Sequence, residues 1–425
     1  PYGLAMRSRS EGDRVDVVSG QRMATALRRI RRSVDQPAHP TVVTVASCDS
    51  GNVGDVVYTG ASFAHELHEE GIPFVVASQF PLSKVGSVNM VDILYRRLLW
   101  GDDPREVLHV LRRELYALHT STAHDWASLV TYCALPPDLP SQLSDTAYEQ
   151  AKAAIDVALS ACDRIVKELT EAGDDGREMS PATVEERLER LLDRADRAAA
   201  RMPTTGEYET EGLGMLGSTE KRKAEVRFHF ASCLAEHDAE YDASAQLSKC
   251  LAGLKASLAH YWDAVVQNMT EKKTPLKLKR SLHWVLTQHI SLRAILGEEF
   301  ERDFWIAAKL SAEIDLRDPN ARVWGHGSLV ELYALLLAFP DAGGVAGVED
   351  PLSVAKEHGG MIVEIAGAGS FAVHSTRRQM ERYVNWWCSD RFNDFLEREG
   401  IVRPAWGRDA GFIDAMKALV QVFPR

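Results

Sequence analysis

A cysteine stands at the end of a strand-forming run near the start of this 425-residue chain. In "TVVTVASCDSGNVG", residues 41–54, the run leads to Cys48, and small or acidic residues follow it. If the run is a strand of an open parallel sheet, Cys48 lies at its carboxyl end, where catalytic groups gather. The backbone N–H groups of the next turn could then face a developing oxyanion: Asp49, Ser50 and Gly51. A thiol there acts as a nucleophile only beside a base, and the alternative is a buried core thiol.

The first 135 residues alternate between strand and helix patterns. Helical spacing predicts a helix over 19–34 with Ser19 as its cap, and another between 60 and 71. Short apolar runs that do not alternate with polar residues lie between such helices: 41–46, 72–78 and 126–133. This order predicts an α/β domain, a parallel sheet with helices on both faces.

The pattern changes after the proline-rich stretch "ALPPDLP", so the first domain is expected to cover residues 1–140. Alanine, glutamate and arginine at helical spacing predict connecting helices over 141–201, and the Gly/Thr/Glu-rich stretch 202–218 is typical of an exposed linker. Paired helices then predict an all-α helical repeat domain over 219–425. Its aromatic residues are expected to pack in the core: Trp262, Trp284, Trp305, Trp324, Phe371, Tyr383, Trp386 and Trp387.

Composition restricts the class of protein. The formal net charge of −12 argues against a nucleic-acid partner held by a basic surface, and no apolar run is long enough for a bilayer span. The six cysteines are scattered without a metal-binding spacing, which is typical of reduced thiols in a cytoplasmic protein. We therefore expect no metal, no cofactor and no membrane association.

Four ordered blocks resemble the CHAT domain of the caspase-like cysteine peptidase clan. They are "SCDSG", "GASFAHELHEEGIPFVVASQFPLS", "LYRRLLWGDDPREVLHVLRRELY" and "HDWASLVTYCALP", and the resemblance runs over about residues 3 to 136. It implies that Cys48 is the catalytic cysteine of an endopeptidase that hydrolyses protein substrates. The later helices resemble, more loosely, the tetratricopeptide-like regions that follow CHAT domains in many bacterial proteins. Together these resemblances imply a regulated protease in bacterial defence or regulated-death signalling.

The chain differs from the family in its catalytic base. The family's histidine belongs to an HG-type motif before the cysteine strand, so we expect it, with the N-terminal part of the domain, ahead of Pro1. His39 falls at the opposite end of the Cys48 strand, about 20 Å away for a strand of this length, and cannot be that base. We interpret His65 and His68 as helix-surface residues and His124 as a capping or packing residue.

Substrate contacts are expected beside Cys48. Asp49 could select a basic side chain of the substrate, or it could simply cap the turn. Ser78 ends the next strand and Gln79 follows it, and both border the same cleft, where Gln79 could contact the substrate backbone. The rival to the peptidase is a non-catalytic CHAT-like scaffold. In both hypotheses the helical repeats bind a regulatory protein partner.

Overall fold

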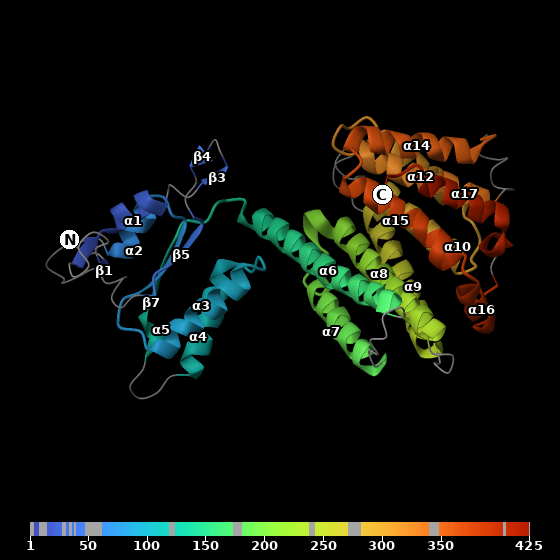
Figure 1. Cartoon of the computed structure of the whole chain (residues 1–425). Helices are drawn as coiled ribbons and strands as arrows, with labels where there is room; N and C mark the ends of the chain where they lie inside the picture. Colours follow the sequence, from blue (N-terminus) through green and yellow to red (C-terminus); the bar gives the residue numbers. More distant parts are fainter. Residues whose placement is uncertain are drawn as a thin grey trace. The chain divides into compact units, whose positions relative to one another are not determined.

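The computed structural model describes the chain in two compact units, residues 1–150 and 151–425, divided within helix α6 (Leu139–Ala172) (Figure 1). We treat each unit by itself. The described residues are 4–7, 15–27, 31–33, 36–37, 40–46, 62–118, 124–172, 181–237, 243–270, 282–339, 348–402 and 405–424.

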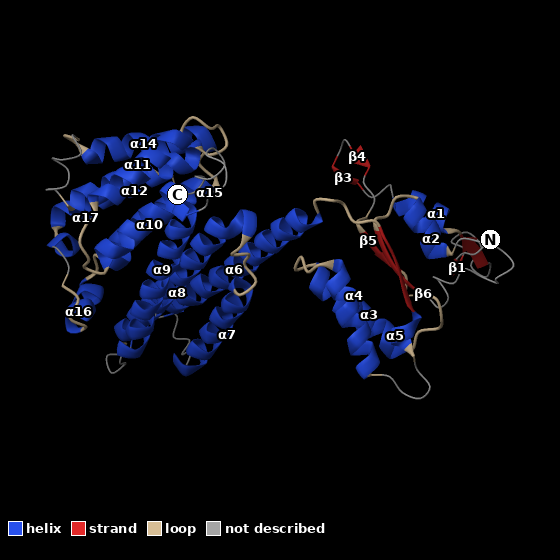
Figure 2. Ribbon diagram, turned by 180° about the vertical axis from the view of Figure 1, so that it is seen from behind, coloured by secondary structure: helices blue, strands red, loops and turns tan. Residues whose placement is uncertain are grey.

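The first unit is built around a three-stranded sheet with the order β5-β6-β7. Strand β6 (Phe74–Ser78) lies in the middle and pairs in parallel with β5 (Val42–Thr44), with Val42 opposite Phe74. On its other side it pairs with β7 (Leu129–Cys133). The sheet can be followed in Figure 2 as the red arrows between two groups of helices.

Both faces of β6 are apolar because helices cover both of them. Val75 and Ala77 pack with α1 (Gly20–Leu27) and α2 (Phe63–Glu69) in one buried cluster. Phe74 and Val76 pack on the opposite face, against α3 (Lys84–Leu98) and α4 (Pro104–Ala117). Alternate side chains of a strand point to opposite faces, so a strand covered twice reads as a continuous apolar run.

The prediction of a parallel sheet is right for β5 and β6 and wrong for β7. Strand β7 runs antiparallel to β6, with Leu129 opposite Ser78 and Cys133 opposite Phe74. Two full helices, α3 and α4, connect the strands, so the chain returns to the edge where β6 ended. After the single turn α5 (Asp125–Ser128), it can only run back along β6. The sheet is mixed, and a caspase-like parallel sheet is not reproduced among the described strands.

Two small hairpins complete the described part of this unit. Strand β1 (Leu4–Arg7) pairs antiparallel with β2 (Val15–Val18), and β3 (Arg31–Ser33) pairs with β4 (Gln36–Pro37). The helix predicted over 19–34 is therefore too long, because Arg31–Ser33 is strand. Its cap is correct, since the Ser19 hydroxyl accepts the N–H of Arg22 at 3.2 Å.

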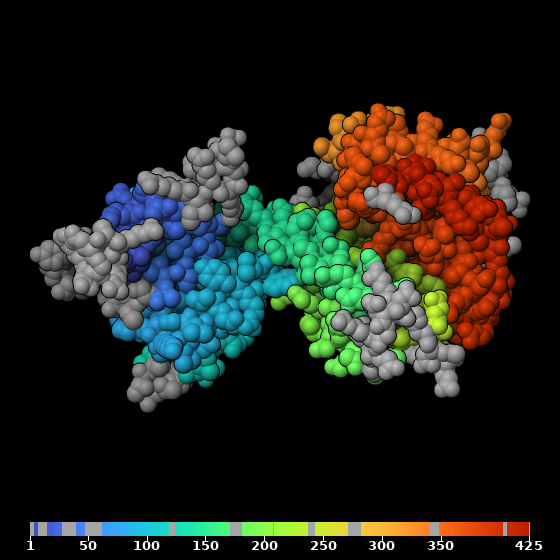
Figure 3. Space-filling model, viewed as in Figure 1, coloured from blue at the N-terminus to red at the C-terminus, as the bar shows by residue number. Residues whose placement is uncertain are grey.

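The second unit is all helical in its described residues, and its C-terminal part (orange to red) forms a continuous surface in Figure 3. No described helix is apolar enough over a sufficient length to cross a membrane. A tetratricopeptide-type repeat is not confirmed, because the helices range from the 34 residues of α6 to the 9 of α16. The elements after α6 are α7 (Pro181–Ala199), η1 (Gly206–Tyr208), α8 (Glu209–His237), α9 (Ser244–Thr270), α10 (Leu282–Ile295), α11 (Arg302–Asp315), α12 (Arg322–Ala338), α14 (Pro351–Ala366), α15 (Phe371–Arg382), η2 (Tyr383–Trp387), α16 (Asp390–Arg398), η3 (Ala405–Arg408) and α17 (Ala410–Val420).

The stretch 202–218 is not a linker throughout, because α8 begins inside it. Its glycines allow close helix packing. A Cβ added at Gly214 would stand 2.6 Å from the Trp284 ring, and one at Gly217 would stand 2.9 Å from the Tyr261 ring. The glycine-rich composition that suggested flexibility thus reflects the close approach of α8 to α9 and α10.

The predicted aromatic core is correct around the π-helical turn η2. Trp386 and Trp387 are fully buried, and Trp305 is buried with its indole N–H donated to the Leu332 carbonyl at 2.9 Å. The prediction is wrong for Phe371, which is 68% exposed, and for Trp324, which is 45% exposed. These two rings contact each other at the surface, 6.0 Å apart, and Trp262 is similarly exposed.

Candidate functional site

The carboxyl ends of β5 and β6 form one edge of the sheet in the first unit. The parallel register continues past β5, where the Val45 N–H donates to the Val76 carbonyl at 2.8 Å. The chain leaves this edge at Ala46. The predicted nucleophile and its turn then lie outside the described residues: Cys48, Asp49, Ser50 and Gly51. The described part of the site is therefore the frame that follows β6.

Ser78 is the last residue of β6 at this edge, and Gln79 follows it. Ser78 is fully buried, and its hydroxyl donates to the Phe80 carbonyl. The Gln79 N–H donates to the Ser128 carbonyl at 2.8 Å, and its half-buried side chain approaches the Ala127 carbonyl at 3.4 Å. Gln79 holds the loop after β6 against α5, whereas the Ser78 hydroxyl bonds within that loop. A direct substrate contact by either stays a prediction.

Asp125 completes this frame by fastening the start of α3. Its carboxylate accepts the N–H of Ser83 at 2.8 Å and the Ser83 hydroxyl at 2.6 Å. The Ser83 hydroxyl oxygen in turn accepts the N–H of Gly86 at 2.9 Å, which makes Ser83 the N-cap of α3. A Cβ at Gly86 would stand 2.3 Å from the Asp125 carboxylate, so glycine is needed at that position.

The described histidines of this unit lie in three places, one of which is the exposed position His109 on α4. On α2, the half-buried His65 ring lies 5.3 Å from Tyr132, and His68 Nδ1 lies 2.9 Å from the Ile72 carbonyl. Both side chains are half-buried beside Tyr132 of β7, whereas the sequence predicted surface positions for them. His124 is exposed and precedes α5, beside the end of β6, and its side chain makes no capping hydrogen bond. Among the described histidines of this unit, His124 is the one that lies near the edge of the sheet where β5 and β6 end.

The described cysteines are poorly suited to nucleophilic attack. Cys133 is exposed, but it lies opposite Phe74 at the other end of β6, and burial raises its pKa. In the second unit, burial raises the pKa of Cys162 to about 12 and also raises that of Cys250. A thiol with a raised pKa is less often the reactive thiolate at neutral pH.

Comparison with known proteins identifies the first unit more closely. Residues 3–134 match the family model of the CHAT domain. The match covers the sheet, its helices and the segment that carries Cys48. No curated protein and no solved structure matches the chain. Residues 3–134 are therefore similar to a CHAT domain, and a helical unit follows them.

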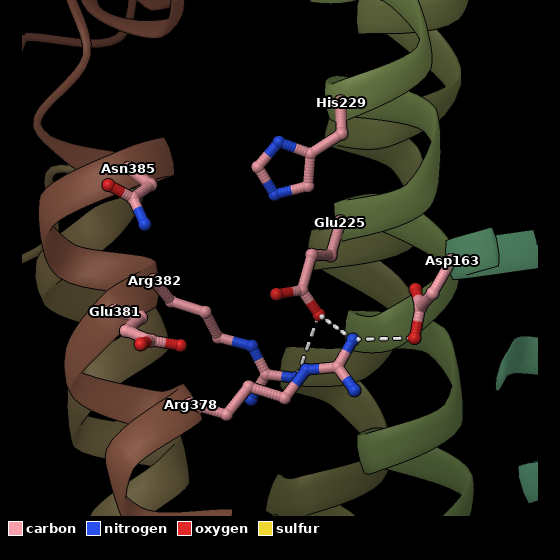
Figure 4. A pocket seen from close by; sticks show the side chains of 7 residues that line it. All are labelled: Asp163, Glu225, His229, Arg378, Glu381, Arg382 and Asn385. Atoms are coloured by element: carbon pink, nitrogen blue, oxygen red, sulfur yellow. Dashed lines mark hydrogen bonds and ion pairs between the residues drawn. The ribbon is translucent and has the colours of Figure 1, made fainter. Parts of the chain in front are cut away.

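The helical unit contains a polar pocket of about 360 Å³ that the sequence did not indicate (Figure 4). Its charged walls are Asp163 of α6, Glu225 of α8, and Arg378, Glu381 and Arg382 of α15. His229 of α8 and Asn385 of η2 face each other across it. A sequence signal exists only for α15, whose positive charges are spaced for one helix face. Their partners are distant in the chain.

Ion pairs organise one end of this pocket. Arg378 donates to Asp163 and to Glu225, each at 3.1 Å, and Arg382 donates to the same Glu225 oxygen at 2.9 Å. Burial alone would raise the pKa of Glu225, but the charges of Arg382 and Arg378 outweigh it and lower that pKa to about 2. Glu225 is therefore ionised at neutral pH, and the two arginines are held in place by carboxylates.

Proposed function

We propose that the first unit is the cysteine-bearing part of a caspase-like peptidase that hydrolyses protein substrates through Cys48. The observation that carries the proposal is the CHAT match over residues 3–134, in which Cys48 follows the strand β5. The parallel pair β5 and β6 supports it, because both strands direct their carboxyl ends to one edge, the usual place for catalytic groups.

In the proposed reaction, the Cys48 thiolate attacks the carbonyl carbon of the scissile peptide bond. A histidine takes the thiol proton and later gives it to the leaving amine. Backbone N–H groups in the turn Asp49, Ser50 and Gly51 would stabilise the oxyanion. Water then hydrolyses the thioester, which releases the carboxylic acid and restores the thiol. Ser78, Gln79 and Asp49 would border the bound substrate.

Thiol reactivity gives the first test. When a histidine base is present, limiting iodoacetamide should alkylate Cys48 faster than any other cysteine, because an activated thiolate is the nucleophile. Cys133 is the internal control, since it is exposed and belongs to the same unit. With that base present, cleavage of a peptide library that is lost in Cys48→Ala and retained in Cys133→Ala would establish the reaction; without the base, little cleavage is expected. Faster alkylation of Cys133 than of Cys48 would contradict the proposal.

A second candidate function is a protein-binding scaffold, cytoplasmic and without catalysis, in which the helical unit captures a partner. The exposed ring pair Trp324 and Phe371 favours it, since aromatic side chains at a surface often anchor protein contacts. The same surface could receive the regulator of a peptidase in bacterial defence or regulated death. A partner recovered with Cys48→Ala but lost with Phe371→Ser would assign binding to the helical unit. A partner that is still recovered with both variants would contradict that assignment.

A further inference from the structure

The pocket of the helical unit is separate from the proposed peptidase chemistry, and its walls define the ligand it can take. Its volume of about 360 Å³ lies at the small end of the roughly 300–1,000 Å³ typical of ligand sites. Every side chain that lines it is polar. An apolar ligand would leave these groups without hydrogen bonds, which is unfavourable. The ligand is therefore small and polar.

The charges of the walls favour a ligand that carries both signs. Three carboxylates and two guanidinium groups line the pocket, and arginines outside the lining compensate further. Arg377 pairs with Glu381 at 2.8 Å, and Arg222 pairs with Asp163 at 3.1 Å. A simple anion would meet the carboxylates, and a simple cation would meet the guanidinium groups. A zwitterion can present each charge to the opposite wall.

One buried donor in the pocket has no partner. Arg382 is 8% exposed, and its Nε–H makes no hydrogen bond in the described residues, although its terminal nitrogens bond to Glu225 and Gln379. A buried guanidinium N–H without an acceptor is costly. That N–H is not accessible from the pocket, so a carboxylate ligand would meet the terminal nitrogens of Arg378 and Arg382, and guanidinium groups bind carboxylates well.

The two uncharged side chains suit a peptide group. No hydrogen bond involves the His229 ring or the Asn385 carboxamide within the described part of the chain, and they lie on opposite sides of the pocket (Figure 4). Burial lowers the pKa of His229, so its neutral ring offers one donor and one acceptor. A carboxamide likewise donates and accepts. A peptide group between them could use both.

We propose that this pocket binds a short zwitterionic peptide of about dipeptide size. Its carboxylate accepts from Arg382 and Arg378, its ammonium group lies toward Glu381, and its peptide group lies between His229 and Asn385. Asn385 belongs to the π-helical turn η2, and such turns occur frequently at functional sites. The helical unit would then sense peptides independently of catalysis at Cys48.

The test measures binding to the full chain. A library of dipeptides is screened by thermal shift, and the best dipeptide is titrated by calorimetry with its N-acetyl and C-amide forms. We expect the zwitterion to bind at least tenfold more tightly than either capped form, because each cap removes a charge-assisted hydrogen bond. Equal binding of the capped forms, or no thermal shift with any dipeptide, would overturn the proposal.

A variant pair places the ligand. Asn385→Leu should weaken dipeptide binding about tenfold, because it removes both hydrogen bonds of an exposed side chain without touching the ion pairs. Asn320→Leu, at an exposed loop position, is the matched control and should bind like the unaltered chain. His229→Phe should weaken binding similarly while keeping its ring contact with Phe228. Unchanged affinity in both Asn385→Leu and His229→Phe would overturn the assignment to this pocket.

Discussion

The two units differ in what they bury. In the first unit, the central strand places Phe74 and Val76 on one face and Val75 and Ala77 on the other, all in contact with apolar helix residues. In the second unit, the core contains a connected set of charged and amide side chains. Lys221 donates to Gln288 and, at 3.1 Å, to Gln379. Both glutamines donate to Glu331 at 2.6 Å.

This difference shows how each interior gains its specificity. An apolar sheet is stabilised by burial, and many apolar side chains of the right volume can serve. A buried polar network requires every donor to meet its acceptor, so it selects one arrangement of helices. Four helices converge on it, because Glu331 of α12 joins Gln288 of α10 and Gln379 of α15, and Lys221 of α8 bonds to both glutamines. We infer that the second unit is the more sensitive to loss of a single charge.

The largest expected effect tests that inference directly. Glu225→Ala removes the acceptor shared by Arg378 and Arg382, and Arg382 stays buried without its carboxylate. Loss of one partner of a buried ion pair typically costs about 3–5 kcal/mol. Urea unfolding should show this loss. The control Glu313→Ala breaks a half-exposed pair with Lys309 and should cost less than about 1 kcal/mol. Similar costs for both variants would contradict a structural role for the network.

The apolar interior of the first unit can be tested by adding one hydroxyl group. Val75→Thr places a hydroxyl in the fully buried face that packs on α1 and α2, and should lower the free energy of unfolding by about 1–3 kcal/mol. Thr44→Val is the reciprocal change. The Thr44 hydroxyl is buried without a hydrogen bond, so its removal should raise stability. The melting temperature should fall in Val75→Thr and rise in Thr44→Val. Shifts of the melting temperature in the same direction would contradict an apolar interior.

Close packing of α8 is tested by filling its glycines. Gly217→Ala should destabilise the chain by about 1–3 kcal/mol, because the new methyl group would overlap the buried Tyr261 ring. Gly360→Ala on α14 meets no atom within 4 Å and should stabilise its helix by up to about 1 kcal/mol. Chemical denaturation compares the two. A neutral Gly217→Ala would mean that 202–218 is loose after all.

The last test concerns the pH dependence of stability. Burial, with a contribution from the charge of Arg382, lowers the pKa of Lys221 from its ordinary 10.5 to about 7. The unfolded chain then binds more protons between these values, so stability should fall as the pH falls from about 10.5 to 7. The slope from this group is at most about 1.4 kcal/mol per pH unit. Lys221→Met should remove that slope, and the half-buried control Lys309→Met should keep it. An unchanged slope in Lys221→Met would show that the lysine titrates normally.

Sequence patterns were sufficient for local elements whose burial is apolar. The run 72–78 predicted β6 because a strand covered on both faces needs apolar residues throughout. The helix between 60 and 71 and the Ser19 cap were also correct, since both depend on neighbours within a few residues. The position of Ser78 at the end of β6 and of Gln79 after it followed from the same strand. Their hydrogen bonds to Phe80 and α5 did not, because those depend on how the chain returns.

The sequence by itself determined the strand that leads to Cys48, the apolar strand β6 and the residues that match the CHAT domain. Only the tertiary structure decided the direction of β7, the helical role of Gly214 and Gly217, and the polar pocket. The physical reason is the range of the interactions. Periodicity reports what one element buries, whereas an ion pair such as Arg378 with Asp163 joins residues 215 positions apart. Such a contact depends on the packing of whole helices, which no local pattern encodes.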